Sequence, residues 1–210
     1  MLPTYYTLAE NGQHEIEIKK SRFICTLRRV ESEDAAREFI QEIKKEHWKA
    51  THNCSAYLLG ERSEIQRSSD DGEPSGTAGI PMLEVLKKNE LINVAAVVTR
   101  YFGGTKLGAG GLIRAYSHAV SEALTAIGIV QGQLQQELLI TISYPLLGKL
   151  QNFLELQELT IADTVFTEQV VVTVMVTESQ LTTYQEMITD LLSGQVTFTE
   201  GATRYFEQRI

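Results

Sequence analysis

The sequence predicts an α+β protein of two domains, covering residues 1–134 and 135–210. Three observations support this prediction. Segments that alternate polar and apolar residues are interleaved with segments of helical periodicity, and a stretch rich in glycine and glutamine, residues 128–136, favours a domain boundary. The two parts also differ in charge: residues 1–135 carry 16 basic and 17 acidic side chains, whereas residues 136–210 carry 3 and 10. Such an imbalance favours two separately folded parts.

The composition is that of an ordinary soluble globular protein, with 43% hydrophobic and 22% charged residues among 210. Apolar runs fall well short of the roughly 18 residues that a membrane span needs. The first residues lack the basic segment and apolar block of a signal peptide, so we expect a cytoplasmic protein that binds no membrane. Cys25 and Cys54 form no disulfide or zinc pattern, and we expect both to be buried within strands.

In the first domain, alternating patterns and apolar runs predict four strands, over residues 13–19, 21–30, 52–59 and 91–99. Residues 60–69 are predicted to be a polar loop or the end of a hairpin. Ser32 is expected to cap a helix that ends near His47 and Trp48, and Pro81 suits the first turn of a second helix. A third helix is predicted from an apolar stripe formed by Leu112, Ile113, Tyr116, Val120, Ala123, Leu124 and Ile127.

The second domain is predicted to have the element order βαββαβ. Its strands are expected over residues 137–144, 159–166, 169–177 and 195–206, with helices over residues 145–157 and 178–192. This order within about 75 residues is typical of the ferredoxin-like split βαβ arrangement. Because the segment holds no histidine or cysteine and few basic residues, we assign it to packing or partner recognition.

A glycine-rich loop joins the strand before it to the third helix and is the main candidate for a binding site. Glycine allows positive φ and close approach, so such a loop can turn several amide N–H groups toward one point beside the positive end of a helix. No acidic residue occurs between Asn93 and Ser121. The predicted anion- or nucleic-acid-binding residues are Arg100, Gly103, Gly104, Thr105, Lys106, Gly108, Gly110, Gly111 and Arg114. The spacing matches neither a Walker A loop nor a dinucleotide-binding loop, and a turn that packs a helix tightly on a sheet is the alternative interpretation.

A second polar loop, residues 68–81, holds three carboxylates within four residues. Such a loop can bind a cation, form a tight turn, brace the glycine loop or supply an acid–base pair. The supporting residues that we predict are His52, Asp70, Asp71 and Glu73. The spacing of the histidines and Cys54 matches no metal-binding motif, so we predict no metal site and no cofactor.

Both loops closely resemble the YigZ/Impact family. The residues that carry the resemblance are 70–79, Asp-Asp-Gly-Glu-Pro-Ser-Gly-Thr-Ala-Gly, and 98–108, Val-Thr-Arg-Tyr-Phe-Gly-Gly-Thr-Lys-Leu-Gly, with further similarity at 52–57 and 114–116. The resemblance implies a first domain like the second domain of ribosomal protein S5 and domain IV of elongation factor G. It implies a second domain like domain V of that factor, and suggests work near RNA or the ribosome.

Eukaryotic relatives in this family are regulators of translation. They compete for the activator of a starvation-responsive initiation-factor kinase, using an additional N-terminal domain. This chain begins directly at the shared domain, so we do not expect it to share that partner. The resemblance therefore implies a role in translation without naming the molecule that is bound.

Two functional hypotheses concern the glycine loop. The first is a non-enzymatic regulator of translation or of a stress response, in which Arg100, Lys106 and Arg114 contact phosphates of RNA, of the ribosome or of a translation-related partner. The second is an enzyme that binds a phosphorylated small molecule or nucleotide, with Asp71 or Glu73 holding Mg²⁺ or acting as a base. We predict no catalytic residue and expect binding rather than catalysis.

A third hypothesis is a protein-interaction module whose contact surface is formed by Tyr101 and Phe102. Exposed paired aromatic rings are unusual outside interfaces, so their exposure in the folded protein distinguishes this hypothesis. The sequence makes no prediction of the oligomeric state.

Overall fold

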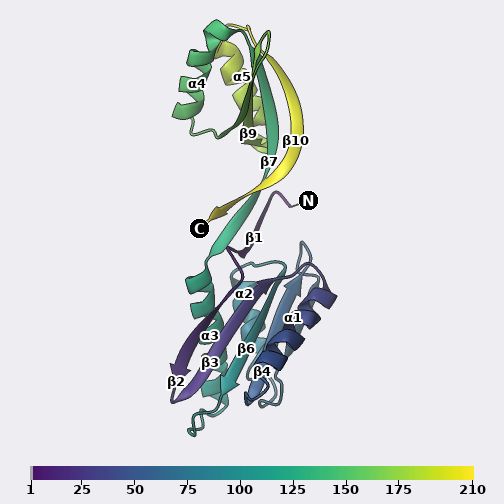
Figure 1. Cartoon of the computed structure of the whole chain (residues 1–210), viewed down its shortest axis with the longest axis vertical. Helices are drawn as coiled ribbons and strands as arrows, with labels where there is room; N and C mark the ends of the chain where they lie inside the picture. Colours follow the sequence, from purple (N-terminus) through teal and green to yellow (C-terminus); the bar gives the residue numbers. More distant parts are fainter. Residues whose placement is uncertain (1) are drawn as a thin grey trace. The chain divides into compact units, whose positions relative to one another are not determined.

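The computed structural model describes residues 2–210 and divides into two compact units (Figure 1). Unit 1 contains the chain up to Gly132 together with Glu207–Ile210, and unit 2 contains Gln133–Phe206. Both units combine helices with antiparallel sheets, which confirms the predicted α+β class. Among the described residues, no helix combines the length and apolarity that a bilayer crossing requires.

Unit 1 is built on a five-stranded sheet in the order β2-β3-β6-β4-β5. All of its pairings are antiparallel. The strands are β2 (Gly12–Ile18), β3 (Ser21–Arg29), β4 (His52–Leu59), β5 (Ile65–Ser69) and β6 (Val94–Tyr101). The residues of β6 are buried up to Arg100, as expected of a central strand covered on both faces.

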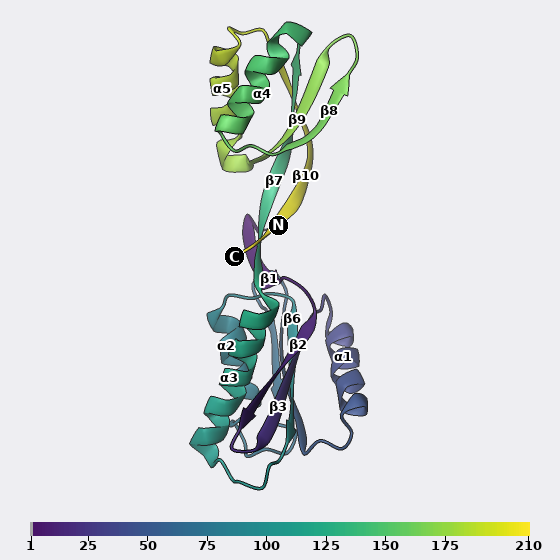
Figure 2. The ribbon, with the colours of Figure 1, turned by 60° about the vertical axis from the view of Figure 1, so that its left-hand side comes forward.

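Helix α1 (Glu33–Glu46) covers one face of this sheet (Figure 2). The Ser32 side chain accepts a hydrogen bond from the backbone N–H of Ala35, which confirms the predicted N-cap. Phe39 and Ile43 of the helix are buried in a cluster with side chains of β4 and β6. The amphipathic pattern of α1 is therefore explained by packing on one sheet face.

Helices α2 (Gly79–Lys88) and α3 (Ala109–Ile127) cover the opposite face (Figure 2). The predicted stripe of α3 is buried there, with one correction: Ile113 is 41% exposed. Since Ile113 directly follows Leu112, it lies about 100° around the helix and leaves the buried stripe. Cys25 and Cys54 are buried in this core, as predicted.

The predicted boundary segment, residues 128–136, is extended and almost wholly strand. It lies within β7 (Ile129–Ile142), and the chain passes from unit 1 to unit 2 between Gly132 and Gln133 inside this strand. Strands β1 (Thr4–Leu8) and β10 (Thr197–Arg209) both pair with β7. These partners satisfy the backbone N–H and C=O groups of the segment that was predicted to be a domain boundary.

The last residues of β10 return to unit 1. There the Glu207 carboxylate accepts two hydrogen bonds of 2.9 Å from the Arg29 guanidinium and one of 2.8 Å from the Tyr5 hydroxyl. The backbone N–H of Ile210 donates to the carbonyl of Ile129 at 3.0 Å. Unit 1 is thus completed by residues that follow unit 2 in the chain.

In unit 2, the sheet order β10-β7-β9-β8 corresponds to 4-1-3-2 within the βαββαβ pattern, the order of a ferredoxin-like split βαβ unit. The remaining elements are η1 (Tyr144–Leu146), α4 (Leu147–Leu156), β8 (Ile161–Phe166), β9 (Val170–Thr177), η2 (Glu178–Gln180) and α5 (Leu181–Leu191). The apolar core combines residues of β7 and β9 with Leu150, Leu154 and Ile188 of the two helices.

Candidate anion-binding site

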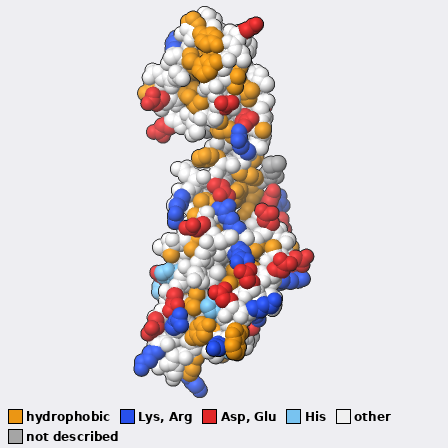
Figure 3. Space-filling model, viewed as in Figure 1, with side chains coloured by type: hydrophobic (Ala, Val, Ile, Leu, Met, Phe, Trp, Pro, Cys, Tyr) orange, Lys and Arg blue, Asp and Glu red, His pale blue; other side chains and the backbone are white. Residues whose placement is uncertain are grey.

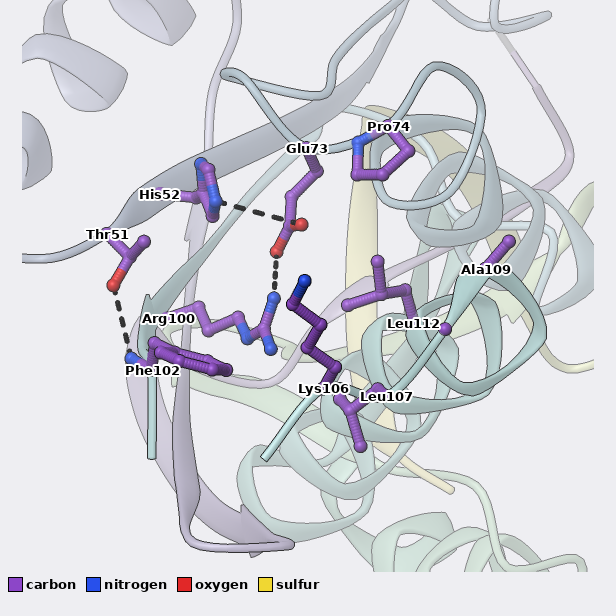
Figure 4. A pocket seen from close by; sticks show the side chains of 11 residues that line it. Thr51, His52, Glu73, Pro74, Arg100, Phe102, Lys106, Leu107, Ala109 and Leu112 are labelled. Atoms are coloured by element: carbon purple, nitrogen blue, oxygen red, sulfur yellow. Dashed lines mark hydrogen bonds and ion pairs between the residues drawn. The ribbon is translucent and has the colours of Figure 1, made fainter. Parts of the chain in front are cut away.

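A pocket of about 380 Å³ in unit 1 brings the two predicted loops together (Figure 4). Its walls come from the start of β4, the acidic loop, the end of β6, the glycine loop and the start of α3. The lining residues are Thr51, His52, Glu73, Pro74, Arg100, Phe102, Lys106, Leu107, Gly108, Ala109 and Leu112. The volume lies within the range of small-molecule sites.

A buried ion pair forms one side of the pocket. Arg100 donates from Nη1 to Oε1 of Glu73 at 2.6 Å, and the Tyr116 hydroxyl donates to the same oxygen at 2.8 Å. The Glu73 and Arg100 side chains are only 3% and 6% exposed. Arg100 was predicted as a contact for external phosphate, but its charge is already balanced inside the protein, so it is not a surface cation.

The Arg100 guanidinium is held by packing as well as by its partner. Its Cζ lies 5.4 Å from the ring centroid of Phe23 and 5.5 Å from that of Phe102. Its Nε is buried and makes no hydrogen bond to any residue between positions 2 and 210. A buried donor without an acceptor costs free energy, which the packing and the ion pair of this guanidinium must offset.

His52 lies next to the ion pair because β4 and β6 place it opposite Arg100. Its Nδ1 is 2.9 Å from the backbone carbonyl oxygen of Asp71, and its Nε2 is 3.7 Å from Oε2 of Glu73. A carbonyl oxygen can only accept, so Nδ1 carries the proton in that hydrogen bond. In the neutral ring, Nε2 is then an acceptor.

Asp70 points away from the pocket and serves the start of α2. Its carboxylate accepts the backbone N–H groups of Gly76 at 2.8 Å, Ala78 at 3.0 Å and Gly79 at 2.8 Å. Burial alone would raise the pKa of Asp70, but these hydrogen bonds outweigh it and lower the pKa below its ordinary value. Asp70 is therefore a structural cap of α2.

Asp71 also points away from the pocket. Its Oδ1 accepts from Lys44 of α1 at 2.6 Å, and its Oδ2 accepts the backbone N–H of Asn53 at 2.6 Å. Of the three carboxylates predicted as one polar loop, only Glu73 therefore faces the glycine loop. In the described part of the chain, no group of three histidine, cysteine or acidic side chains is placed to hold a metal ion.

The first pair of glycines in the loop has a packing role. A Cβ on Gly103 would lie 1.9 Å from the carbonyl oxygen of Lys20, so only glycine fits against the turn between β2 and β3. Gly104 and Thr105 follow on the exposed side of the loop and do not line the pocket. The tight-packing interpretation of the glycine cluster therefore holds at Gly103.

The start of α3, in contrast to Gly103, is not tightly packed. Gly108 is the N-cap with φ of +71°, and a Cβ added there would meet no atom within 4 Å. Within residues 2–210, no side chain caps this end and the first turn holds no acidic residue. The first helical hydrogen bond runs from Leu112 to Gly108, which leaves the N–H groups of the first turn, including those of Gly110 and Gly111, without helical acceptors. With Lys106 beside it, this end can bind an anion.

Arg114 does not contribute to the pocket. It is exposed on α3 and is absent from the pocket walls, and a Cβ on Gly110 would lie 3.8 Å from its Nη1. The prediction grouped Arg114 with Arg100 and Lys106 because all three flank one loop. The helix instead carries Arg114 along its outer surface, so only Lys106 remains as an accessible cation of the three at the pocket.

Tyr116 is the site residue that the sequence interpretation missed, because it was assigned to the apolar stripe. It does lie in the core, where its ring makes an edge contact with Phe23, but its hydroxyl binds Glu73 and receives a 3.4 Å contact from the Cys54 thiol. Burial raises the pKa of Tyr116 above its ordinary value and that of Cys54 to about 12. Both groups are therefore protonated at neutral pH and act as donors.

The aromatic pair of the third hypothesis is divided. Phe102 is 46% exposed at the pocket. Tyr101 is half-buried, and its hydroxyl lies 2.9 Å from Nδ1 of His47. Phe102 alone of the pair is therefore a well-exposed ring, and the paired aromatic surface on which the interaction-module hypothesis depends is present only in part.

Comparisons with known proteins agree with the resemblance seen in the sequence. The Impact N-terminal domain model matches residues 19–124, and a domain of unknown function (DUF1949) matches residues 140–195. The IMPACT family member YvyE of Bacillus subtilis is 51% identical over 210 residues, covering 100% of this chain and 97% of that protein. YigZ of Escherichia coli is 46% identical over 110 residues, covering 51% of this chain and 54% of that protein.

A crystal structure described as that of a hypothetical protein is also similar. It has 30% sequence identity and a TM-score of 0.60, and the match covers 94% of this chain and 97% of that chain. The likeness in fold therefore extends over both units.

Proposed function

This chain belongs to the IMPACT family, and we propose that it regulates translation by binding a phosphate group of RNA or of the ribosome in the pocket at the start of α3. Eukaryotic members of this family regulate translation, and this supplies the cellular context of the proposal. The observation that carries the proposal is the uncapped start of α3 beside Lys106. A helix N-terminus with free N–H groups attracts phosphate, and a lysine adds a full positive charge.

The charge balance of the pocket supports an anionic ligand. Glu73 and Arg100 neutralise each other, so the positive end of α3 and Lys106 determine the sign of the remaining field. On the face of unit 1 seen in Figure 3, basic and acidic side chains are interspersed rather than gathered in a broad basic patch. We therefore expect a local contact with one or two phosphates rather than an extended electrostatic surface.

Co-sedimentation of the purified protein with ribosomes and subunits at several salt concentrations tests this proposal. We expect salt-sensitive pelleting of the wild type and weaker pelleting of Lys106→Ala. Loss of one phosphate contact should flatten the slope of log affinity against log salt by roughly 0.7 to 0.9. Arg100 is left intact, because removing a buried charge from its pair would destabilise the fold itself.

The matched control is Lys88→Ala, which removes the same charge from an exposed position near the end of α2. This variant should pellet like the wild type with an unchanged salt slope. Equal behaviour of the Lys106 and Lys88 variants, or pelleting that does not respond to salt, would contradict the proposed phosphate contact.

A second candidate function is an enzyme that acts on a phosphorylated small molecule. The observation in its favour is that His52 presents Nε2 as a potential base beside the buried Glu73 carboxylate. Turnover would appear as phosphate released from a panel of nucleotides and phosphorylated sugars, and it should be lost in His52→Ala. Stable, unchanged ligands after long incubation with the wild type would exclude it for that panel.

A further inference from the structure

Glu73 uses only one of its two carboxylate oxygens. Oε1 accepts from both Arg100 and Tyr116, at 2.6 and 2.8 Å. Oε2 has its nearest polar neighbour in Nε2 of His52 at 3.7 Å, which is too long for a hydrogen bond. Within the described residues, Oε2 therefore lacks a donor, although the carboxylate is almost fully buried. A carboxylate oxygen that lines a pocket without a donor gains from a strong external donor.

Glu73 Oε2 and His52 Nε2, which lie 3.7 Å apart, are both hydrogen-bond acceptors. The carbonyl of Asp71 holds the proton of His52 on Nδ1, so in the neutral ring Nε2 presents a lone pair. Glu73 Oε2 and His52 Nε2 thus form an acceptor pair 3.7 Å apart on the pocket wall. Two neighbouring hydroxyl groups of a ligand satisfy such a pair, one donating to each acceptor.

The residues near the start of α3, on the other side of the pocket, favour the binding of a negatively charged group. Figure 4 shows His52, Glu73 and Arg100 on one side of the pocket and Leu107 and Ala109 on the other, with the Lys106 side chain between them in this view. The uncapped first turn of α3 and Lys106 favour an anion there, and the unsatisfied Oε2 of Glu73 across the pocket is a second, independent sign of a ligand. The ligand therefore carries neighbouring hydroxyls at one end and an anionic group at the other.

The remaining surface of the pocket is apolar. Apart from Thr51, its side chains are those of Pro74, Phe102, Leu107, Ala109 and Leu112, and the pocket has a volume of about 380 Å³. This space accommodates a single nucleotide but not a duplex. An exposed aromatic ring at the rim is a suitable contact for an unpaired base.

We infer that the pocket binds one ribonucleotide unit through its 2′,3′-diol and its 5′-phosphate. The diol donates to Glu73 Oε2 and His52 Nε2, and the phosphate accepts from the start of α3 and from Lys106. Carboxylates bind ribose hydroxyls in the same way in dinucleotide-binding folds, and the 2′-hydroxyl distinguishes RNA from DNA. The same chemistry is present in a free ribonucleoside 5′-monophosphate and in the 3′-terminal nucleotide of an RNA. This inference rests on the proposed function and assigns the ligand of its site.

Calorimetric titration of the full chain with the four ribonucleoside 5′-monophosphates and their 2′-deoxy counterparts tests the inference. We expect at least one ribonucleotide to bind about tenfold or more tightly than its deoxy counterpart, because the deoxy form leaves an acceptor unsatisfied. Affinities within threefold of one another for all four pairs, or no binding by any mononucleotide, would overturn the inference.

Two variants test the contacts at the two ends of the ligand separately. In this binding mode the 2′-hydroxyl donates to His52 Nε2 and the 3′-hydroxyl to Glu73 Oε2, so His52→Ala should reduce the preference for ribose over deoxyribose while leaving deoxynucleotide affinity unchanged. Lys106→Ala should weaken both series by the same factor. His118→Ala is the matched control, because His118 is an exposed histidine of α3 outside the pocket walls. A loss of ribose preference in the His118 variant as well would contradict the assignment of His52.

The two sources of the ligand are distinguished with an oligoribonucleotide that ends in a 3′-hydroxyl and the same strand ending in a 3′-phosphate. Preference for the free end identifies an RNA terminus. Selective binding of mononucleotides without any binding of the strand or of ribosomes identifies a free nucleotide, so the inference would hold and the proposed function would fail. Salt-sensitive ribosome binding that depends on Lys106, without ribose selectivity, would leave the proposed function standing and overturn the inference.

Discussion

Helices α2 and α3 pack side by side on one face of the same sheet, but their N-termini are completed in opposite ways (Figure 2). Neither N-cap, Ala78 or Gly108, supplies a capping side chain. At α2 the carboxylate of Asp70 reaches in from the preceding loop and accepts two N–H groups of the helix start. At α3 no described residue plays this part. The chain thus completes the positive end of α2 internally and leaves that of α3 without an internal carboxylate.

The largest expected effect follows from removing the internal cap of α2. Asp70→Ala leaves three backbone N–H groups without their charged acceptor, so we expect a loss of about 2–3 kcal/mol in the free energy of unfolding. Urea denaturation monitored by circular dichroism measures this loss. A change below about 0.5 kcal/mol would show that water replaces the carboxylate without cost.

The pH dependence of this effect provides its internal control. The folded protein holds the pKa of Asp70 below the ordinary value of 3.8, so its contribution is fully present above that pH. As the pH falls through the lower folded pKa, the carboxylate is protonated and the contribution is lost. The difference in the free energy of unfolding between the wild type and Asp70→Ala should therefore be constant near neutral pH. It should fall toward zero in acid.

An intermediate effect is expected at the locally capped helix of unit 1. Ser32 accepts the N–H of Ala35 at 3.1 Å, and Ser32→Ala should cost about 1 kcal/mol. Ser32→Asn, which retains a side-chain acceptor, should restore most of the loss in the same urea titration. Equal losses in both variants would mean that the cap itself contributes nothing.

We expect the smallest effect on stability, and the most informative one, from introducing an acidic residue at the start of α3. Ala109→Asp places a carboxylate in the first turn, so we expect the protein to be more stable by roughly 0.3–1 kcal/mol and to bind anions less well. Stability is measured by urea denaturation and binding by titration with inorganic phosphate. The control is Ser121→Asp, which adds the same charge near the middle of α3. Anion binding that survives in Ala109→Asp would place the phosphate elsewhere.

Most of the elements were predictable because their signals are local. The alternation in β2, the cap at Ser32 and the stripe of α3 each depend on residues within a few positions of one another. Strand β5 was predicted only as a loop or hairpin end, since its exposed polar residues give an edge strand little hydrophobic pattern. Ile113 was wrongly assigned to the buried stripe for a related reason: apolar character alone does not fix the face of a helix.

The site was predictable in its residue types but not in its pairings. The absence of acids from Asn93 to Ser121 suggested a free basic cluster, yet Glu73, 27 residues before Arg100, is folded against it. That contact depends on the pairing of β4 with β6 and on the path of the acidic loop. The hydroxyl of Tyr116 was hidden by the same long-range geometry, because an apolar stripe predicts burial of the ring and says nothing of its polar tip.

The return of Glu207 to Arg29 and Tyr5 also bears on how the protein is made. Synthesis proceeds from the N-terminus, so Arg29 and Tyr5 leave the ribosome early, and all of unit 2 is translated before Glu207 follows. Any folding of unit 1 that takes place during synthesis therefore proceeds without this ion pair, which can form only at the end. Until then, Arg29 has only backbone carbonyls of its own unit as acceptors, and the position of β10 beside β7 is unfilled.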